Sequence, residues 1–307
     1  MSTYESILVL GTGELGTEVL RSLASHHHRH SRPITVLLRP CPPDVEATSR
    51  RKQQLADFKN LSISTLEANI AEDSQSVLET IFGQYHTIIG CSGTTYPPGT
   101  QLKIARAVLA SSVRRYLPWQ FGVDYDVIGR GSSQDLFSEQ LDVRDLLRGQ
   151  IKTDWVIIST GMFMSFLFEP TFGVVECDWT AVTALGAWDT KVTVTSVQDI
   201  GRVVAEVTWR APAVKGVIYT AGATVSYKDV ADAVAKVQQE RGVTIRREVA
   251  TVDRLRSELE SDPNNGLKKY RVVFAEGKGV AWDEAKTVNS RWGMEMCGVQ
   301  DWLSKQL

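Results

Sequence analysis

A glycine-rich motif near the start of the chain has the residue types and spacing that suit phosphate binding. Residues 7–10 are all apolar, and glycines follow at positions 11, 13 and 16 in the pattern G-x-G-x-x-G. In this motif the first glycine makes the tight turn out of a strand, and the second lets a pyrophosphate approach the backbone. The third lets the following helix pack closely on the strand, and the helix N-terminus offers free N–H groups. A buried strand, the glycines and a helical apolar pattern occur here in that order. They predict a dinucleotide site, with an ordinary loop as the alternative.

A second candidate position, Arg39, concerns the choice between NAD and NADP. Arg39 ends the predicted strand 33–39, where folds of this type meet the adenosine ribose. An acidic residue there would bind the 2′-hydroxyl of NAD, whereas a guanidinium suits the 2′-phosphate of NADP. Arg50, Arg51 and Lys52 follow at the start of a predicted helix and could close over the same phosphate. A solvated basic helix face is the alternative, and the one we favour for Arg50 alone. Together the cluster favours NADP.

The chain lacks several catalytic signatures that accompany other nucleotide-binding or hydrolytic sites. No lysine stands four residues after any tyrosine, so the pair Tyr-x-x-x-Lys is absent. The patterns G-x-S-x-G, H-E-x-x-H and the P-loop are absent too. The four cysteines are far apart in sequence and form no C-x-x-C pair. This argues against a zinc site or a disulfide scaffold, and we expect no metal.

Alternating strands and helices surround these motifs and predict the fold. The predicted strands are 7–10, 33–39, 61–66, 87–93, 113–118 and 154–160, with helical patterns between them. This alternation is typical of an α/β fold with a Rossmann-type, doubly wound parallel sheet. We expect residues 1–160 to form an NADP-binding domain and residues 161–307 a smaller substrate lobe. Part of that lobe, about 192–220, returns to the Rossmann sheet.

Composition and charge exclude several other kinds of partner. The chain of 307 residues is 43% hydrophobic and 23% charged, with a net charge of −2, which is ordinary for a globular protein. Nothing in this balance indicates nucleic acid or an anionic membrane. The most apolar run, 155–175, is interrupted by Gly161, Glu169 and Pro170, so it is not expected to span a membrane. We expect no signal peptide, because the first predicted strand begins already at residue 7. We therefore expect a cytoplasmic monomer or homodimer with a small-molecule substrate.

Several collinear segments resemble the isoflavone reductase-like and NmrA-like branch of the atypical short-chain dehydrogenases. They are the glycine motif, Arg39, residues 113–122 (VRRYLPWQFG, where the family usually reads vkRFlPSeFG), residues 137–147, residues 153–163 and 199–201 (DIG). The resemblance covers almost the whole chain and is looser after about residue 205. It implies an NADPH-binding Rossmann domain in reductases of small, often aromatic metabolites, including those of secondary metabolism. One branch of nitrogen regulators binds the dinucleotide and a protein partner without known turnover.

The resemblance also implies roles for individual residues. The diphosphate falls to Gly11, Thr12, Gly13, Leu15 and Gly16, and the 2′-phosphate to Arg39 with Arg51 or Lys52. The nicotinamide side falls to Ser92, Gly93, Phe121, Gly161, Met162 and Phe163. Aromatic residues at the same end of the predicted sheet and in the second lobe are candidate substrate contacts, although any one of them is more often part of a core: Trp119, Phe163, Phe166 and Trp179.

Two positions depart from the family pattern and bear on catalysis. The family's active lysine, four residues before Arg144, is Gln140 here, and its Ser-Glu is Trp119-Gln120. A glutamine can hydrogen-bond a ribose hydroxyl but cannot deliver a proton. We expect Gln140 to lie on a helix face toward the nicotinamide ribose, opposite a buried face.

The source of the proton is then open, with Tyr125, Asp124 or water as candidates. The sequence favours an NADPH-dependent reductase of a small, largely apolar substrate. A non-catalytic dinucleotide sensor and an enzyme of redox-neutral chemistry, such as cyclisation or isomerisation, remain as alternatives.

Overall fold

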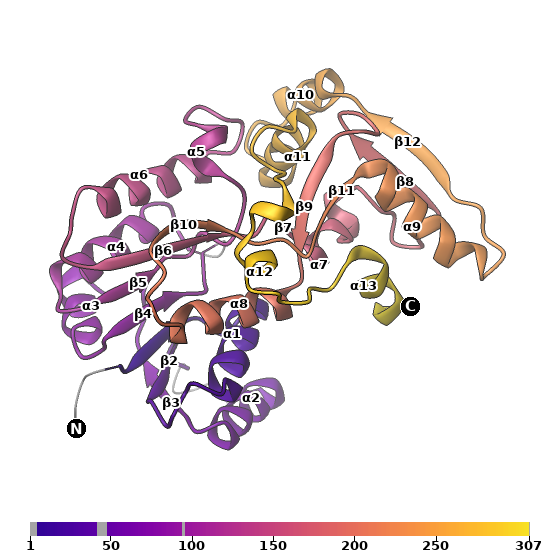
Figure 1. Ribbon diagram of the computed structural model, residues 1–307. Coiled ribbons are helices and arrows are strands. Elements are labelled where there is room, and N and C mark those ends of the chain that lie inside the picture. Colours follow the sequence, from indigo (N-terminus) through magenta and orange to yellow (C-terminus); the bar gives the residue numbers. More distant parts are fainter. Residues whose placement is uncertain (1–4, 42–47, 94–95, 307) are drawn as a thin grey trace. The chain divides into compact units, whose positions relative to one another are not determined.

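A seven-stranded sheet includes the strand that leads into the glycine motif (Figure 1). The computed structural model describes residues 5–41, 48–93 and 96–306. The strands lie in the order β10-β6-β5-β4-β1-β2-β3, and β1 pairs in parallel with both β2 and β4. Chain order reverses at β1, as it does in doubly wound folds, so the predicted fold class is confirmed. The strands are β1 Ile7–Leu10, β2 Ile34–Leu38, β3 Ile63–Glu67, β4 Thr87–Gly90, β5 Arg115–Leu117, β6 Asp154–Ser159 and β10 Gly216–Tyr219.

The helices that connect these strands arise from the apolar periodicity of the sequence. In α1 (Glu14–Ser25), the buried side chains Leu15, Val19 and Leu23 recur at helical spacing. Residues of β1 are all buried, which explains its unbroken apolar run. The other connecting helices are α2 Ser49–Asn60, α3 Gln75–Phe82, α4 Thr100–Ala110, α6 Leu136–Arg148 and α8 Val197–Trp209.

The remaining elements form small sheets and helices around a separate apolar core. One sheet has the order β11-β9-β7, and another pairs β12 with β8. The strands are β7 Met162–Phe163, β8 Ala181–Leu185, β9 Lys191–Thr195, β11 Ala223–Ser226 and β12 Arg246–Ala250. The helices are α5 Tyr125–Ile128, α7 Met164–Leu167, α9 Tyr227–Gln239, α10 Val252–Glu260, α11 Gly266–Glu276, α12 Val288–Arg291 and α13 Val299–Gln306, with short 3₁₀ turns at Pro170–Phe172 and Glu284–Lys286.

Contacts divide the chain into two compact units. The first consists of residues 1–120, 142–158 and 200–217, and the second of residues 121–141, 159–199 and 218–307. Residues 200–217 thus belong to the nucleotide-binding unit. Residues 121–141 group with the second unit, although composition alone places them with the first.

No helix in the described residues is long and apolar enough to cross a membrane. The four cysteines, all within the described residues, form no disulfide. The described residues also contain no cluster of three His, Cys, Asp or Glu side chains that could hold a metal ion.

Candidate cofactor and substrate site

The glycine loop between β1 and α1 has a different constraint at each glycine. Gly11 has a φ of +105°, and a Cβ there would lie 1.7 Å from Ser92 Oγ. A Cβ on Gly16 would lie 2.2 Å from the carbonyl oxygen of Gly11. At Gly13, by contrast, a Cβ would meet no atom within 4 Å. The protein itself therefore leaves open space beside Gly13 at the N-terminus of α1, where the motif is expected to admit a pyrophosphate.

Side chains from two other helices hold this loop and the end of β4. Gln54 Nε2 on α2 donates to the Thr12 carbonyl at 3.1 Å. Gln101 Nε2 on α4 donates to the Ser92 carbonyl at 3.1 Å. Neither glutamine has a role predicted from the sequence. Gln101 could have been noticed because it opens a helix directly after the predicted fourth strand, but no local pattern singles out Gln54.

The basic residues predicted to bind the 2′-phosphate are in different situations. Arg39 is exposed directly after β2. Arg51 on α2 donates from Nη2 to Glu67 Oε1 at 3.0 Å, and Lys52 beside it is exposed. Burial raises the pKa of Tyr96, while its hydrogen bond with Ser92 and the charge of Arg39 act in the opposite direction. The charge of Arg39 thus acts on Tyr96, and Arg39 is the stronger candidate anchor because Arg51 already pairs with the Glu67 carboxylate.

The indole of Trp119 packs against the backbone at the carboxyl end of β4. A Cβ on Gly93 would lie 2.0 Å from the Trp119 ring, and a Cβ on Gly90 would lie 2.9 Å from the Trp119 amide nitrogen. Ligands of doubly wound sheets bind outside the carboxyl ends of the strands. The structure thus brings Ser92, Gly93 and Trp119 together at the edge where a cofactor is expected.

Gln140 lies on α6, as predicted, but not on an open face of that helix. Its side chain is fully buried, like those of Leu141, Val143 and Leu147 around it. The prediction that Gln140 lies on a different face of the helix from the buried side chains is therefore wrong. The reason is that α6 also buries a polar side, where Arg144 donates from Nε to Gln120 Oε1 at 2.8 Å. The contact between Gln140 and a nicotinamide ribose stays a prediction.

The second unit joins two of the predicted nicotinamide-side segments. The amides of Thr160 and Gly161 both donate to the carbonyl of Gly122, at 2.9 and 3.0 Å. A Cβ on Gly161 would lie 2.1 Å from the Thr193 carbonyl oxygen, so this loop packs closely on β9. Phe121 is buried beside Gly122, and the loop leads into Met162–Phe163, which is strand β7.

The aromatic candidates of the second unit pack into its core. Tyr125 is buried, and its ring lies edge-on to that of Phe137, with centroids 4.9 Å apart. Phe166 packs on Phe172 at 4.6 Å, and Trp179 stacks on Phe168 at 5.6 Å. Packing alone therefore accounts for these side chains.

Asp124 accepts hydrogen bonds at both carboxylate oxygens. Oδ1 accepts from the amides of Asp126 and Val127 at the start of α5, and Oδ2 accepts from the Tyr219 hydroxyl at 2.7 Å. Both carboxylate oxygens of Asp124 are thus engaged by donors of the second unit.

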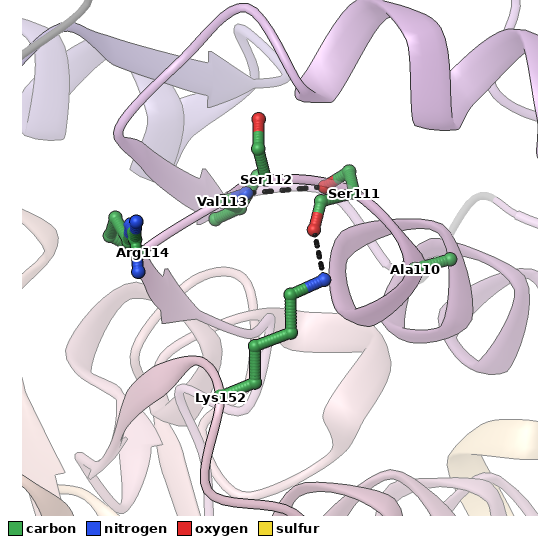
Figure 2. Close-up of a pocket in the computed structure, with 6 residues that line it drawn as sticks. All are labelled: Ala110, Ser111, Ser112, Val113, Arg114 and Lys152. Atoms are coloured by element: carbon green, nitrogen blue, oxygen red, sulfur yellow. Dashed lines mark hydrogen bonds between the residues drawn. The ribbon is translucent and has the colours of Figure 1, made fainter.

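A cavity of about 340 Å³ in the first unit is separate from all these residues. It lies at the amino end of β5 and is lined by residues 110–114 and Lys152 (Figure 2). The glycine loop follows the carboxyl end of β1, which is the opposite edge of a parallel sheet. Lys152 Nζ donates to the Ser111 carbonyl at 2.7 Å and to the Leu109 carbonyl at 3.4 Å. This lysine therefore satisfies the last carbonyls of α4, and the cavity is not a candidate cofactor site.

The sheet order and the glycine loop define a Rossmann-type dinucleotide-binding protein. The chain belongs to the NmrA-like family, whose model matches residues 3–291. An NmrA-like family domain-containing oxidoreductase of Gibberella moniliformis is 45% identical over 301 residues, which cover 97% of each chain. This relative confirms the expected oxidoreductase class.

Solved structures with the same fold include reductases that bind NADPH. The leucoanthocyanidin reductase of Vitis vinifera in complex with NADPH superimposes with a TM-score of 0.78 at 16% identity, over 98% of both chains. An NADPH-dependent quinone oxidoreductase of Escherichia coli, also in complex with NADPH, has a TM-score of 0.74 at 15% identity, over 98% of this chain and 99% of its own. NADPH is thus the cofactor of both of these proteins, in agreement with the expectation from Arg39.

Proposed function

We propose that this protein is an NADPH-dependent reductase of small, largely apolar metabolites, with aromatic compounds among them. The observation that carries the proposal is the open space beside Gly13, between two glycines that can carry no side chain, at the N-terminus of α1. Arg39 after β2 supports NADPH over NADH. The solved reductases named above support hydride transfer on this fold. The partner is then a small molecule, and the chain acts as a cytoplasmic monomer or homodimer.

Each candidate residue has a specific part in this proposal. The amides at the start of α1 would bind the diphosphate, and Arg39 would bind the 2′-phosphate, with Lys52 beside it. In the first unit, Ser92 and Gly93 would contact the nicotinamide, and Trp119 would offer its indole to the substrate. When bound, NADPH supplies the hydride, and the site must hold the accepting carbon in near-attack geometry.

Gln140 would act by positioning and not by proton transfer. Its amide can donate and accept hydrogen bonds but has no proton to give at neutral pH. Positioned acids contribute typically about 10²–10⁴-fold to such reactions, so the proposal favours substrates that need little acid assistance, or protonation by water. An activated alkene or an iminium meets this condition.

Following both product formation and NADPH absorbance over a panel of aromatic enones, quinones and iminium compounds tests the proposal. A reductase consumes one NADPH for each product molecule, and Gln140→Ala should lower kcat by about tenfold or less, the scale of one neutral hydrogen bond. Tight NADPH binding without consumption on any compound would instead support the sensor. Product formation that does not track NADPH oxidation would support redox-neutral chemistry.

A further inference from the structure

The hydrogen bond between Gln54 and Thr12 connects α2 to the peptide that joins Thr12 to Gly13 in the glycine loop. Gln54 is half-buried on α2, and its Nε2 donates to the Thr12 carbonyl oxygen at 3.1 Å. A carbonyl oxygen can only accept, so the amide nitrogen of the glutamine must make this contact. The same carbonyl accepts from Thr17 Oγ1 on α1 at 3.3 Å. Two helices of the first unit therefore hold one carbonyl of the loop in a fixed direction.

The direction of this carbonyl decides where the next amide points. The C=O and N–H groups of a planar trans peptide point to opposite sides, so the Gly13 N–H points away from the side of the Thr12 carbonyl. This N–H donates no hydrogen bond within the part of the chain that the structure describes. The space beside Gly13 is also open, since a Cβ there would meet no atom within 4 Å. The amide of Gly13 is thus available to donate to an oxyanion.

We infer that Gln54 is a positioning residue for the diphosphate of the cofactor, because by fixing the Thr12 carbonyl it aims the Gly13 N–H at the phosphate oxygens. The inference rests on the diphosphate site proposed above. Without the donor of Gln54 the peptide can rotate more freely, and cofactor binding must then restrict that rotation. The effect on affinity is modest, since the lost contact is one neutral hydrogen bond and Thr17 keeps the other.

This role differs from the role proposed for Arg39. Arg39 would bind the 2′-phosphate, which NADPH has and NADH lacks, whereas both dinucleotides have the same diphosphate. Loss of the Gln54 amide should therefore weaken the binding of NADPH and NADH by the same factor. It should spare a ligand that has the 2′-phosphate but no diphosphate, and adenosine 2′-monophosphate is such a ligand.

Calorimetric titrations of Gln54→Met with NADPH, NADH and adenosine 2′-monophosphate test the inference. Methionine has a similar length to glutamine but cannot donate to the Thr12 carbonyl. Affinity for both dinucleotides should fall about three- to tenfold, while affinity for adenosine 2′-monophosphate stays within about twofold of the wild type. Gln53→Met is the matched control, because Gln53 is exposed on the same helix and its Nε2 donates to Asp57 Oδ1 at 2.9 Å, also on α2. The control should bind all three ligands as the wild type does.

Several outcomes would overturn the inference. A loss confined to NADPH would mean that Gln54 acts on the 2′-phosphate, and an equal loss for all three ligands would mean a general change of the site. An equal loss in Gln53→Met would assign the effect to the helix as a whole.

The same titrations separate this inference from the proposed function. Unchanged affinity of Gln54→Met for both dinucleotides, with tight binding by the wild type, would overturn the inference and leave the proposed function standing. A wild type that binds neither dinucleotide would contradict both. The expected pattern of affinities, with no NADPH oxidation on any compound, would support the inference and contradict the reductase.

Discussion

The open space beside Gly13 makes a sharp prediction for the variant Gly13→Val. Gly13 has a φ of −68° and a ψ of −165°, an extended conformation that valine also adopts. Its Cβ would meet nothing within 4 Å, so the folded protein can hold the new side chain without a clash. The bound diphosphate, by contrast, would have to occupy the same space.

The expected effects on stability and binding therefore differ. Loss of glycine at the N-cap costs about 0.5–1 kcal/mol of stability, and the less flexible unfolded chain offsets about 0.4–1 kcal/mol of it. The melting temperature should change by about 2 °C or less. Affinity for NADPH should fall by at least about 100-fold, which corresponds to about 2.7 kcal/mol.

Gly16→Ala is the matched control, because its Cβ would lie 2.2 Å from the Gly11 carbonyl oxygen. That oxygen belongs to the backbone of the loop, so the loop itself must move. Overpacking of this kind costs about 1–3 kcal/mol, and both the melting temperature and NADPH affinity should fall. Thermal unfolding and a calorimetric NADPH titration measure the two quantities.

Two results would refute the reasoning. If Gly13→Val binds NADPH within about threefold of the wild type, the diphosphate does not lie beside Gly13. If Gly13→Val is destabilised as strongly as Gly16→Ala, the space beside Gly13 is not open in the folded protein.

Three further predictions concern the cofactor, a helix end and a histidine. Arg39→Ala should reduce the preference for NADPH over NADH from about 10- to 150-fold to about threefold or less, and equal affinity of the wild type for both cofactors would contradict the role of Arg39. Lys152→Ala should lower the free energy of unfolding by about 0.5–1 kcal/mol, because the last carbonyls of α4 lose their donor, while a titration shows unchanged NADPH affinity. Burial lowers the pKa of His86 below its ordinary 6.5, because it disfavours the charged imidazole. The neutral imidazole therefore stabilises the folded protein above pH 6.5, and this stabilisation is lost as the pH falls through the pKa of His86 in the folded state. The melting temperature of His86→Gln should accordingly fall less than that of the wild type between pH 7 and 5, and parallel pH profiles would count against this.

The first unit shows how far local patterns reach. The apolar run of β1 and the spacing of Leu15, Val19 and Leu23 predict the strand and the helix on either side of the glycine loop, with ends within a residue or two of those observed. These patterns work because a parallel strand is buried on both faces and a covering helix on one.

The second unit shows where such patterns end. Residues 264–266 (NNG) predict a turn, but Asn265 is the N-cap of α11, accepting from the amides of Leu267 and Lys268. The same local chemistry serves both a turn and a helix start, and packing of the following apolar residues decides between them. The strand β12 pairs with β8 more than 60 residues earlier, and no local signal specifies such a partner.

The sequence by itself determined the fold class, the glycine loop and the cationic residue after β2, because each depends on neighbouring residues and on backbone conformation. The tertiary structure alone decided that Gln140 is buried and that Arg144 bonds Gln120, 24 residues away along the chain. Helical periodicity identifies an apolar face, but a face that buries polar side chains against one another has no such signature. Such a face becomes visible only when distant segments pack and their hydrogen bonds compensate for the loss of water.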